Sequence, residues 1–351
     1  MEHLRKKIGQ LFTIAFPGTD LTPERRNFIE HHNIGGVILF RSNCPSLKDL
    51  RRLTQELKDL KTENPLWIAL DHEGGRVHRL PAPFTHFPSM SHVKTIDQAF
   101  QVGEAMGREL AAVEIDLDFA PVLDVWTNPC NKVIGDRAFS YRPVDVAELG
   151  TAFIRGLQGT GVAACGKHFP GHGDTDFDSH FTLPQASHNR RRLEAIEWIP
   201  FRAAISEGLA SIMTAHVQYD ILDEGVPATL SPRIIRDTLR AELGFEGVIF
   251  SDDMMMDAIR HWGPIEKCCV MALQAGCDNI LLCHQEERFL DILNSVYQSV
   301  ESGEIAESVI ENAYRRVQNL KQHFVLPKKD VPLSVIGSSD HRSLNRNLRI
   351  K

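Results

Sequence analysis

The sequence lacks the features that mark disulfide-linked, zinc-cluster and membrane-spanning proteins. Its 351 residues include seven cysteines, an odd number, and no two of them form a C-x-x-C pair. Neither a disulfide framework nor a structural zinc cluster is therefore expected, and a reducing compartment fits better. No apolar run approaches the ~18 residues of a membrane span. Residues 1–16 superficially resemble a signal peptide, but Gln10 interrupts the apolar stretch and no small-residue cleavage site follows, so we expect a cytoplasmic protein.

An excess of positive charge is also missing. The chain has 39 Lys and Arg against 46 Asp and Glu, a net charge of −7, so it has no basic field to gather nucleic acid or an anionic membrane. The hydrophobic content of 42% and charged content of 24% are those of a globular protein, which excludes disorder, collagen and coiled coil. With no internal repeat and no linker-like segment, we expect a single domain and a monomer.

Eight short apolar runs recur along the chain, and helical segments separate them. Nearly continuous apolar strands that are each followed by a helix form a parallel sheet covered by helices, so eight units predict a closed (β/α)8 TIM barrel. An open doubly wound sheet is the alternative, but no G-x-G-x-x-G motif follows the first run. The eight runs are residues 11–16, 36–40, 67–70, 117–123, 162–166, 211–215, 247–250 and 279–282.

The barrel is expected to occupy residues 1–325 as the catalytic domain, ending in a helix over residues 305–324. Residues 326–351 are polar and basic, and we expect them to form a short C-terminal tail.

Chemically versatile side chains follow the ends of the predicted strands. Asp71 follows the third run, Asp124 the fourth, Lys167 and His168 the fifth, and Asp252 the seventh. The carboxyl ends of all barrel strands share one mouth, where active sites form. We therefore expect residues that are far apart in sequence to converge there.

The loop after the fifth run is rich in glycine, histidine and aspartate. Gly171 and Gly173 permit backbone conformations that are closed to other residues. Asp178 and His180 lie two residues apart, close enough to hydrogen-bond, and an aspartate that orients a histidine makes a proton-transfer pair poised near neutral pH. A solvated polar loop is the structural alternative.

Asp252 ends the predicted seventh strand, whose sequence GVIFSD extends the apolar run by two residues, so its carboxylate is expected to point into the mouth. There it can act as a nucleophile, a metal ligand or an acceptor for sugar hydroxyls. For its neighbour Asp253 we prefer a local structural role at the start of the following helix.

Further charged residues at the mouth suit a hydroxyl-rich ligand, because carboxylates accept from hydroxyls and cations donate to oxygen. An ion-pair network that stabilises the loops is the alternative, and we assign Arg76 to structure. The candidate ligand-binding residues are Asp71, Arg79, Arg137, Lys167 and His168.

Three chemistries compete for this set. A retaining glycosidase would use Asp252 as nucleophile and His180 for the leaving-group proton. A metal-dependent hydrolase would use His168, His172, His180, His216, Asp124 and Asp252 as ligands. However, Pro170 and Gly171 lie between the first two histidines, so helical spacing does not apply. We expect no metal and no cofactor. A sugar-binding barrel without catalysis leaves the pair Asp178 and His180 unexplained.

Four motifs resemble the β-N-acetylglucosaminidases of glycoside hydrolase family 3. They are DHEGGRVHR at 71–79, KHFPGHGDT at 167–175, DSH at 178–180 and FSDD at 250–253. The resemblance covers about residues 10–322, and the chain length fits the single-domain bacterial form that acts in cytoplasmic peptidoglycan recycling.

The resemblance implies removal of non-reducing terminal β-linked GlcNAc from fragments that contain N-acetylmuramic acid, including 1,6-anhydro-muropeptides. It further implies that Asp252 is the nucleophile, that His180 is the acid/base assisted by Asp178, and that the 2-acetamido group is bound without attacking. The five candidate ligand-binding residues would hold GlcNAc. Because a histidine repels an anionic acceptor less than a carboxylate does, phosphate is an alternative acceptor to water.

Overall fold

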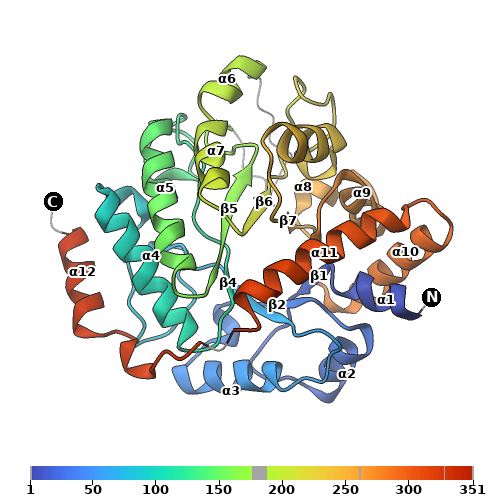
Figure 1. Cartoon of the computed structure of the whole chain (residues 1–351), viewed down its shortest axis with the longest axis horizontal. Coiled ribbons are helices and arrows are strands. Elements are labelled where there is room, and N and C mark those ends of the chain that lie inside the picture. Colours follow the sequence, from blue (N-terminus) through green and yellow to red (C-terminus); the bar gives the residue numbers. More distant parts are fainter. Residues whose placement is uncertain (1, 176–187, 261, 328, 350–351) are drawn as a thin grey trace.

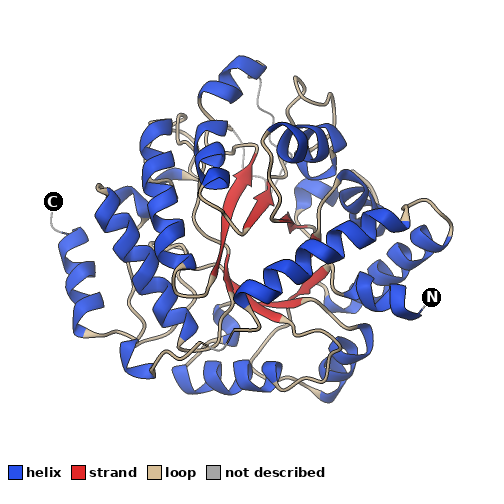
Figure 2. Cartoon of the chain, viewed as in Figure 1, coloured by secondary structure: helices blue, strands red, loops and turns tan. Residues whose placement is uncertain are grey.

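The computed structural model describes residues 2–175, 188–260, 262–327 and 329–349. Its centre is a closed barrel in which eight parallel strands pair in chain order and β8 pairs with β1 (Figure 2). The predicted TIM barrel and all eight predicted strands are therefore confirmed, and the open sheet is wrong. The strands are β1 (Phe12–Ile14), β2 (Gly36–Leu39), β3 (Trp67–Leu70), β4 (Leu117–Asp118), β5 (Ala163–Phe169), β6 (Ser211–Thr214), β7 (Val248–Asp253) and β8 (Asn279–Leu282).

Helices form a ring around the strands (Figure 1). Two helix boundaries lie where the sequence predicts them. The hydroxyl of Thr22 accepts a hydrogen bond from the N–H of Arg25 at the start of α2, and Gly276 ends α9 in a left-handed conformation. The helices are α1 (Glu2–Gly9), α2 (Pro23–His32), α3 (Leu47–Lys58), α4 (Ile96–Ala111), α5 (Pro143–Gln158), α6 (Arg190–Ala195), α7 (Trp198–Ser206), the π-type helix η5 (Arg233–Glu242), α8 (Asp257–Arg260), α9 (Ile265–Ala275), α10 (Phe289–Glu301), α11 (Glu307–Phe324) and α12 (Ser339–Arg349).

Two strands run further than their apolar pattern predicts. β5 continues to Phe169, so Lys167 and His168 are strand residues and not members of the following loop, and β7 continues to Asp253, so Asp252 lies in the seventh strand as expected. The pairing of β5 with β6 shifts register between Lys167 and Phe169. Rigid strand backbone therefore positions the polar side chains at the mouth.

Helix α11 closes the end of the barrel at which the strands begin, and Figure 1 shows it running across the strands. Its buried Lys321 donates to Oε1 of Gln10 at 2.7 Å and to the carbonyl of Gly35 at 2.8 Å. The ammonium also lies 4.7 Å from the centroid of the Trp67 ring, within the range of a cation–π contact. The opposite end of the barrel is left for the site.

The segment expected to be a tail contains helix α12, which packs against α4 (Figure 1). Ahead of it, the ammonium of Lys329 donates to Oδ1 of the buried Asp116 at 2.7 Å. Polar, basic composition did not predict this packing, because the partners lie more than 200 residues earlier in the chain. None of the helices in the described part of the chain is both long and apolar enough to cross a membrane.

Candidate active site

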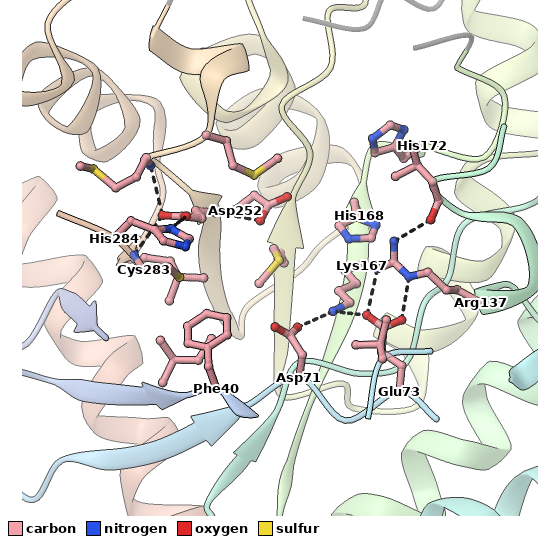
Figure 3. Close-up of a pocket in the computed structure, with 18 of the residues that line it drawn as sticks. Phe40, Asp71, Glu73, Arg137, Lys167, His168, His172, Asp252, Cys283 and His284 are labelled. Atoms are coloured by element: carbon pink, nitrogen blue, oxygen red, sulfur yellow. Dashed lines mark hydrogen bonds and ion pairs between the residues drawn. The ribbon is translucent and has the colours of Figure 1, made fainter. Parts of the chain in front are cut away.

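The mouth of the barrel holds a pocket to which several strands contribute (Figure 3). Asp71 directly follows β3, Lys167 and His168 lie on β5, and Asp252 lies on β7. The structure thus brings together six of the eight predicted site residues, as convergence at the strand ends predicts. The six are Asp71, Arg79, Arg137, Lys167, His168 and Asp252.

A buried network of charges forms one wall of this pocket. The ammonium of Lys167 lies 2.8 Å from Oδ1 of Asp71 and 2.6 Å from Oε1 of Glu73. The guanidinium of Arg137 binds both oxygens of Glu73, at 2.7 and 2.9 Å. Arg79 reaches the same cluster, with its Nη2 at 3.8 Å from Oδ2 of Asp71.

The network keeps its members charged despite burial. Burial raises the pKa of Glu73, but the opposite charges of Arg137 and Lys167 outweigh it and hold that pKa far below its usual range. Burial likewise lowers the pKa of Lys167, and Asp71 and Glu73 more than reverse the effect. Fixed cations and carboxylates therefore face the pocket, ready to donate to and accept from hydroxyl groups.

Asp252 points into the pocket from β7 (Figure 3). Its Oδ1 accepts the backbone N–H of Asp253 at 2.8 Å. Burial raises the pKa of Asp252, but His216, His168, this N–H and Lys167 together hold it below the ordinary value. An ionised carboxylate in a confined pocket is chemically suited to nucleophilic attack.

Asp124 organises the histidines of β5 and the loop after it. Its Oδ2 accepts from Nδ1 of His168 at 2.7 Å, and its Oδ1 accepts the backbone N–H of His172 at 2.7 Å. Burial raises the pKa of Asp124, but His168 leads the opposing effects and the pKa is lowered. Within the described residues, no group of three or more His, Cys, Asp or Glu side chains is arranged to hold a metal ion.

Arg76 makes a structural contact, as predicted, and Asp253 also has a structural role, but as the last residue of β7 and not at the start of α8. Oδ1 of Asp253 accepts backbone N–H groups of Met255 at 3.1 Å and of Cys283 at 3.0 Å, which ties β7 to the end of β8. Its Oδ2 accepts a hydrogen bond from Nδ1 of His284 at 2.9 Å. Nη2 of Arg76 donates to the carbonyl of Lys132 at 2.8 Å.

Asp178 and His180 lie outside the described residues. Sequence reasoning missed Glu73, although it stands two residues after Asp71 in the DHEGGRVHR motif and could have been found as a second carboxylate on that segment. It also missed Phe40 and His284, which line the pocket on the side away from Lys167 (Figure 3). The ring of Phe40 lies 5.7 Å from the guanidinium of Arg79.

Comparison with known proteins gives consistent matches. The model of the glycosyl hydrolase family 3 N-terminal domain matches residues 3–320. A β-hexosaminidase of Alkalilimnicola ehrlichii is 43% identical over 283 residues, which cover 78% of this chain and 80% of that protein. A family 3 β-N-acetylglucosaminidase of Paenibacillus sp. superposes with a TM-score of 0.93 at 37% identity, covering 98% of this chain and 68% of that one. NagZ of Neisseria gonorrhoeae, in complex with N-trifluoroacetyl-D-glucosamine, gives a TM-score of 0.82 at 34% identity and covers 96% of each chain.

A (β/α)8 barrel with ionised carboxylates and cations around one pocket at its mouth defines a barrel enzyme, and these relatives define its chemistry as glycoside hydrolysis. The chain belongs to glycosyl hydrolase family 3 and, within it, to the β-hexosaminidase group that these relatives form. The resemblance inferred from the four motifs is confirmed.

Proposed function

We propose that the protein is a retaining exo-β-N-acetylglucosaminidase that removes non-reducing terminal β-linked GlcNAc. The single observation that carries the proposal is the carboxylate of Asp252, which lines one pocket together with the charged wall of Asp71, Lys167 and Glu73. The named activities of its relatives support the sugar. So does the N-acylated glucosamine bound by the Neisseria relative.

In the proposed reaction, the carboxylate of Asp252 attacks the anomeric carbon as the bond from that carbon to the leaving oxygen breaks. His180, assisted by Asp178, gives its proton to that oxygen. Water then loses a proton to His180 and attacks the glycosyl-enzyme, which releases GlcNAc with its original anomeric configuration. The roles of His180 and Asp178 rest on the family resemblance, because both lie outside the described residues.

The charged wall is the proposed binding surface for GlcNAc. In this proposal Asp71 accepts from sugar hydroxyls, while Lys167, Arg137 and His168 donate to sugar oxygens. Arg79 stands at the edge of the wall beside Phe40. Since ion pairs already fix these groups, little reorganisation is needed when the sugar binds.

The proposed natural substrates are GlcNAc-1,6-anhydro-N-acetylmuramic acid and the corresponding muropeptides. In each of them the enzyme would cleave the β-1,4 linkage that joins the terminal GlcNAc to the muramic acid. This would place the enzyme in cytoplasmic peptidoglycan recycling. The support is the resemblance to the single-domain bacterial group and the match to NagZ over 96% of both chains.

The test is release of nitrophenol from 4-nitrophenyl β-GlcNAc and from the matching β-glucoside, with and without a chelator and phosphate. We expect turnover selective for GlcNAc and unchanged by the chelator. Asp252→Asn should lower kcat by at least about 10³-fold, while Asp253→Asn, the neighbouring carboxylate, should stay within about tenfold of the parent.

Absence of turnover on both glycosides by a folded sample would refute the proposal. Full activity in Asp252→Asn would move the nucleophile elsewhere, with Asp253 as the first suspect. Acceleration by phosphate with formation of a sugar phosphate would identify a phosphorylase.

A further inference from the structure

Residues 329–349, here named the C-terminal brace, lie beyond the matched family domain, which ends at residue 320. Lys329 holds one end of the brace to the barrel through Asp116 at 2.7 Å and the carbonyl of Ile115 at 3.0 Å. The other end is helix α12, which packs on α4. The brace therefore spans from the base of β4 to the outer face of α4.

A buried carboxylate on α4 joins the brace to the loop of residues 71–95, here named the β3–α4 loop. Glu109 is 2% exposed. Its oxygens accept the backbone N–H of Thr85 at 2.8 Å and the hydroxyl of Thr85 at 2.7 Å. From the brace, Oε1 of Glu109 accepts the N–H of Gly337 at 3.0 Å and Nδ1 of His341 at 2.7 Å.

The brace also contacts the β3–α4 loop directly. Nη2 of Arg349 donates to the carbonyl of His86 at 2.8 Å. Gly337 has φ +59, and a Cβ added there would lie 2.2 Å from the carbonyl oxygen of Pro83. Only glycine allows so close an approach.

Inside the loop, the braced segment supports the residues that reach the pocket. The N–H of Gly75 donates to the carbonyl of Phe87 at 2.9 Å, and Nε2 of His86 lies 2.7 Å from the carbonyl of Gly75. The ring of His86 stacks on that of His78, with centroids 4.2 Å apart. Gly75 is two residues from Glu73, and His78 is adjacent to Arg79. The segments that carry these two pocket residues therefore both contact residues 83–87.

We propose that the C-terminal brace is a positioning element for the active site: through Glu109, His341 and Arg349 it fixes the β3–α4 loop and thereby sets the affinity of the pocket for the sugar. The effect on affinity rests on the proposed function. The contacts by which the brace holds the β3–α4 loop do not depend on it. Asp71, Glu73 and Arg79 all belong to this loop, and regular strand or α-helix is absent from its described portion before α4. Its geometry therefore depends on contacts from outside it.

The test compares His341→Ala and Arg349→Ala with Arg346→Ala, a matched change at an exposed arginine on the same helix. KM and kcat on 4-nitrophenyl β-GlcNAc, thermal unfolding, and hydrogen exchange of peptides over residues 71–87 are measured on the full chain. Each brace variant should raise KM by about fivefold, within the range seen for connected networks, with kcat changed by less than about twofold. Exchange over residues 71–87 should accelerate.

His341→Asn, which keeps an amide donor at the position of Nδ1 for Glu109, should recover most of the affinity, while Arg346→Ala should resemble the parent in every readout. A lower unfolding temperature with unchanged KM and unchanged exchange over residues 71–87 would reduce the brace to a stabilising element and overturn the proposal. If the parent does not cleave the glycoside, the proposed function fails, and the exchange measurement still decides whether the brace holds the loop.

Discussion

At the scale of residues, the pocket depends on charges that balance one another. Glu73 and Asp71 carry two negative charges, and Lys167 and Arg137 carry two positive charges, within direct contact distances. Burying any one of these ions alone costs several kcal/mol, so each is tolerated because its partners are present. The same pairing fixes the side chains before any sugar arrives, and Glu73 holds both cations at once.

Glu73→Gln should therefore destabilise the fold by about 3 kcal/mol, because it leaves two buried cations short of a partner. It should also raise KM for the GlcNAc glycoside, since Lys167 loses part of its positioning. Denaturant unfolding and steady-state kinetics measure the two effects. Glu56→Gln, which breaks the partly exposed pair with Arg52, should cost less than about 1 kcal/mol. Equal losses in the two variants would contradict the role given to Glu73.

The sequence predicted those pocket residues whose position depends only on the order of the strands. Asp71, Lys167 and Asp252 follow or end apolar runs, and a closed barrel brings those ends together. Glu73 was not predicted, because its importance comes from two ion pairs with residues 64 and 94 positions away. Locally the sequence offers only a second carboxylate two residues after Asp71, and it does not show that this carboxylate is buried between two cations.

At the scale of elements, the apolar runs predicted that eight strands exist but not where they end. β5 continues through Lys167 and His168 to Phe169, and β7 continues through Ser251 to Asp253, because their backbone groups still find partners although these side chains are mostly polar. Alternation of apolar residues reports burial in a core and carries no signal for a buried charged pocket. The polar ends of these strands are the part that reaches the site.

The C-terminal brace illustrates the same limit. Its helix is polar and basic, and only two of its residues, His341 and Leu348, are buried. The contacts that anchor it to Glu109 and Asp116 use a backbone N–H, one imidazole and one ammonium, and these two partners precede the brace by more than 200 residues. Composition therefore predicted a tail, while tertiary contacts make it a packed segment.

At the scale of the whole molecule, the buried His72 and His172 and the half-buried His78 couple stability to pH. Burial is the largest cause that lowers the pKa of His78 and of His172, each to about 4, and that of His72 well below 6.5. Neighbouring histidines add to each effect. In the unfolded chain these histidines take up protons near pH 6.5. Unfolding therefore binds protons at pH values between the lowered pKa of the folded protein and 6.5.

The free energy of unfolding should consequently fall as the pH is lowered from 6.5 to about 4. The slope is up to about 1.4 kcal/mol per pH unit for each proton that unfolding takes up. Above that interval these histidines are neutral in both states and contribute no slope. Urea unfolding at several pH values measures it. His78→Gln should make the slope shallower, whereas His3→Gln, at an exposed position, should leave it unchanged. An unchanged slope in His78→Gln would contradict the coupling.

The most direct test of the proposed glycosidase is covalent capture of its intermediate. The enzyme would be incubated with a 5-fluoro glycosyl fluoride of GlcNAc. This reagent forms a glycosyl-enzyme quickly, and the glycosyl-enzyme is then hydrolysed slowly. Mass spectrometry of the intact protein and of fragmented peptides would then locate the adduct. We expect one glycosyl unit on Asp252, with none on Asp253 and none in Asp252→Asn. A catalytically active enzyme that gives no adduct, or an adduct on another residue, would contradict nucleophilic attack by Asp252.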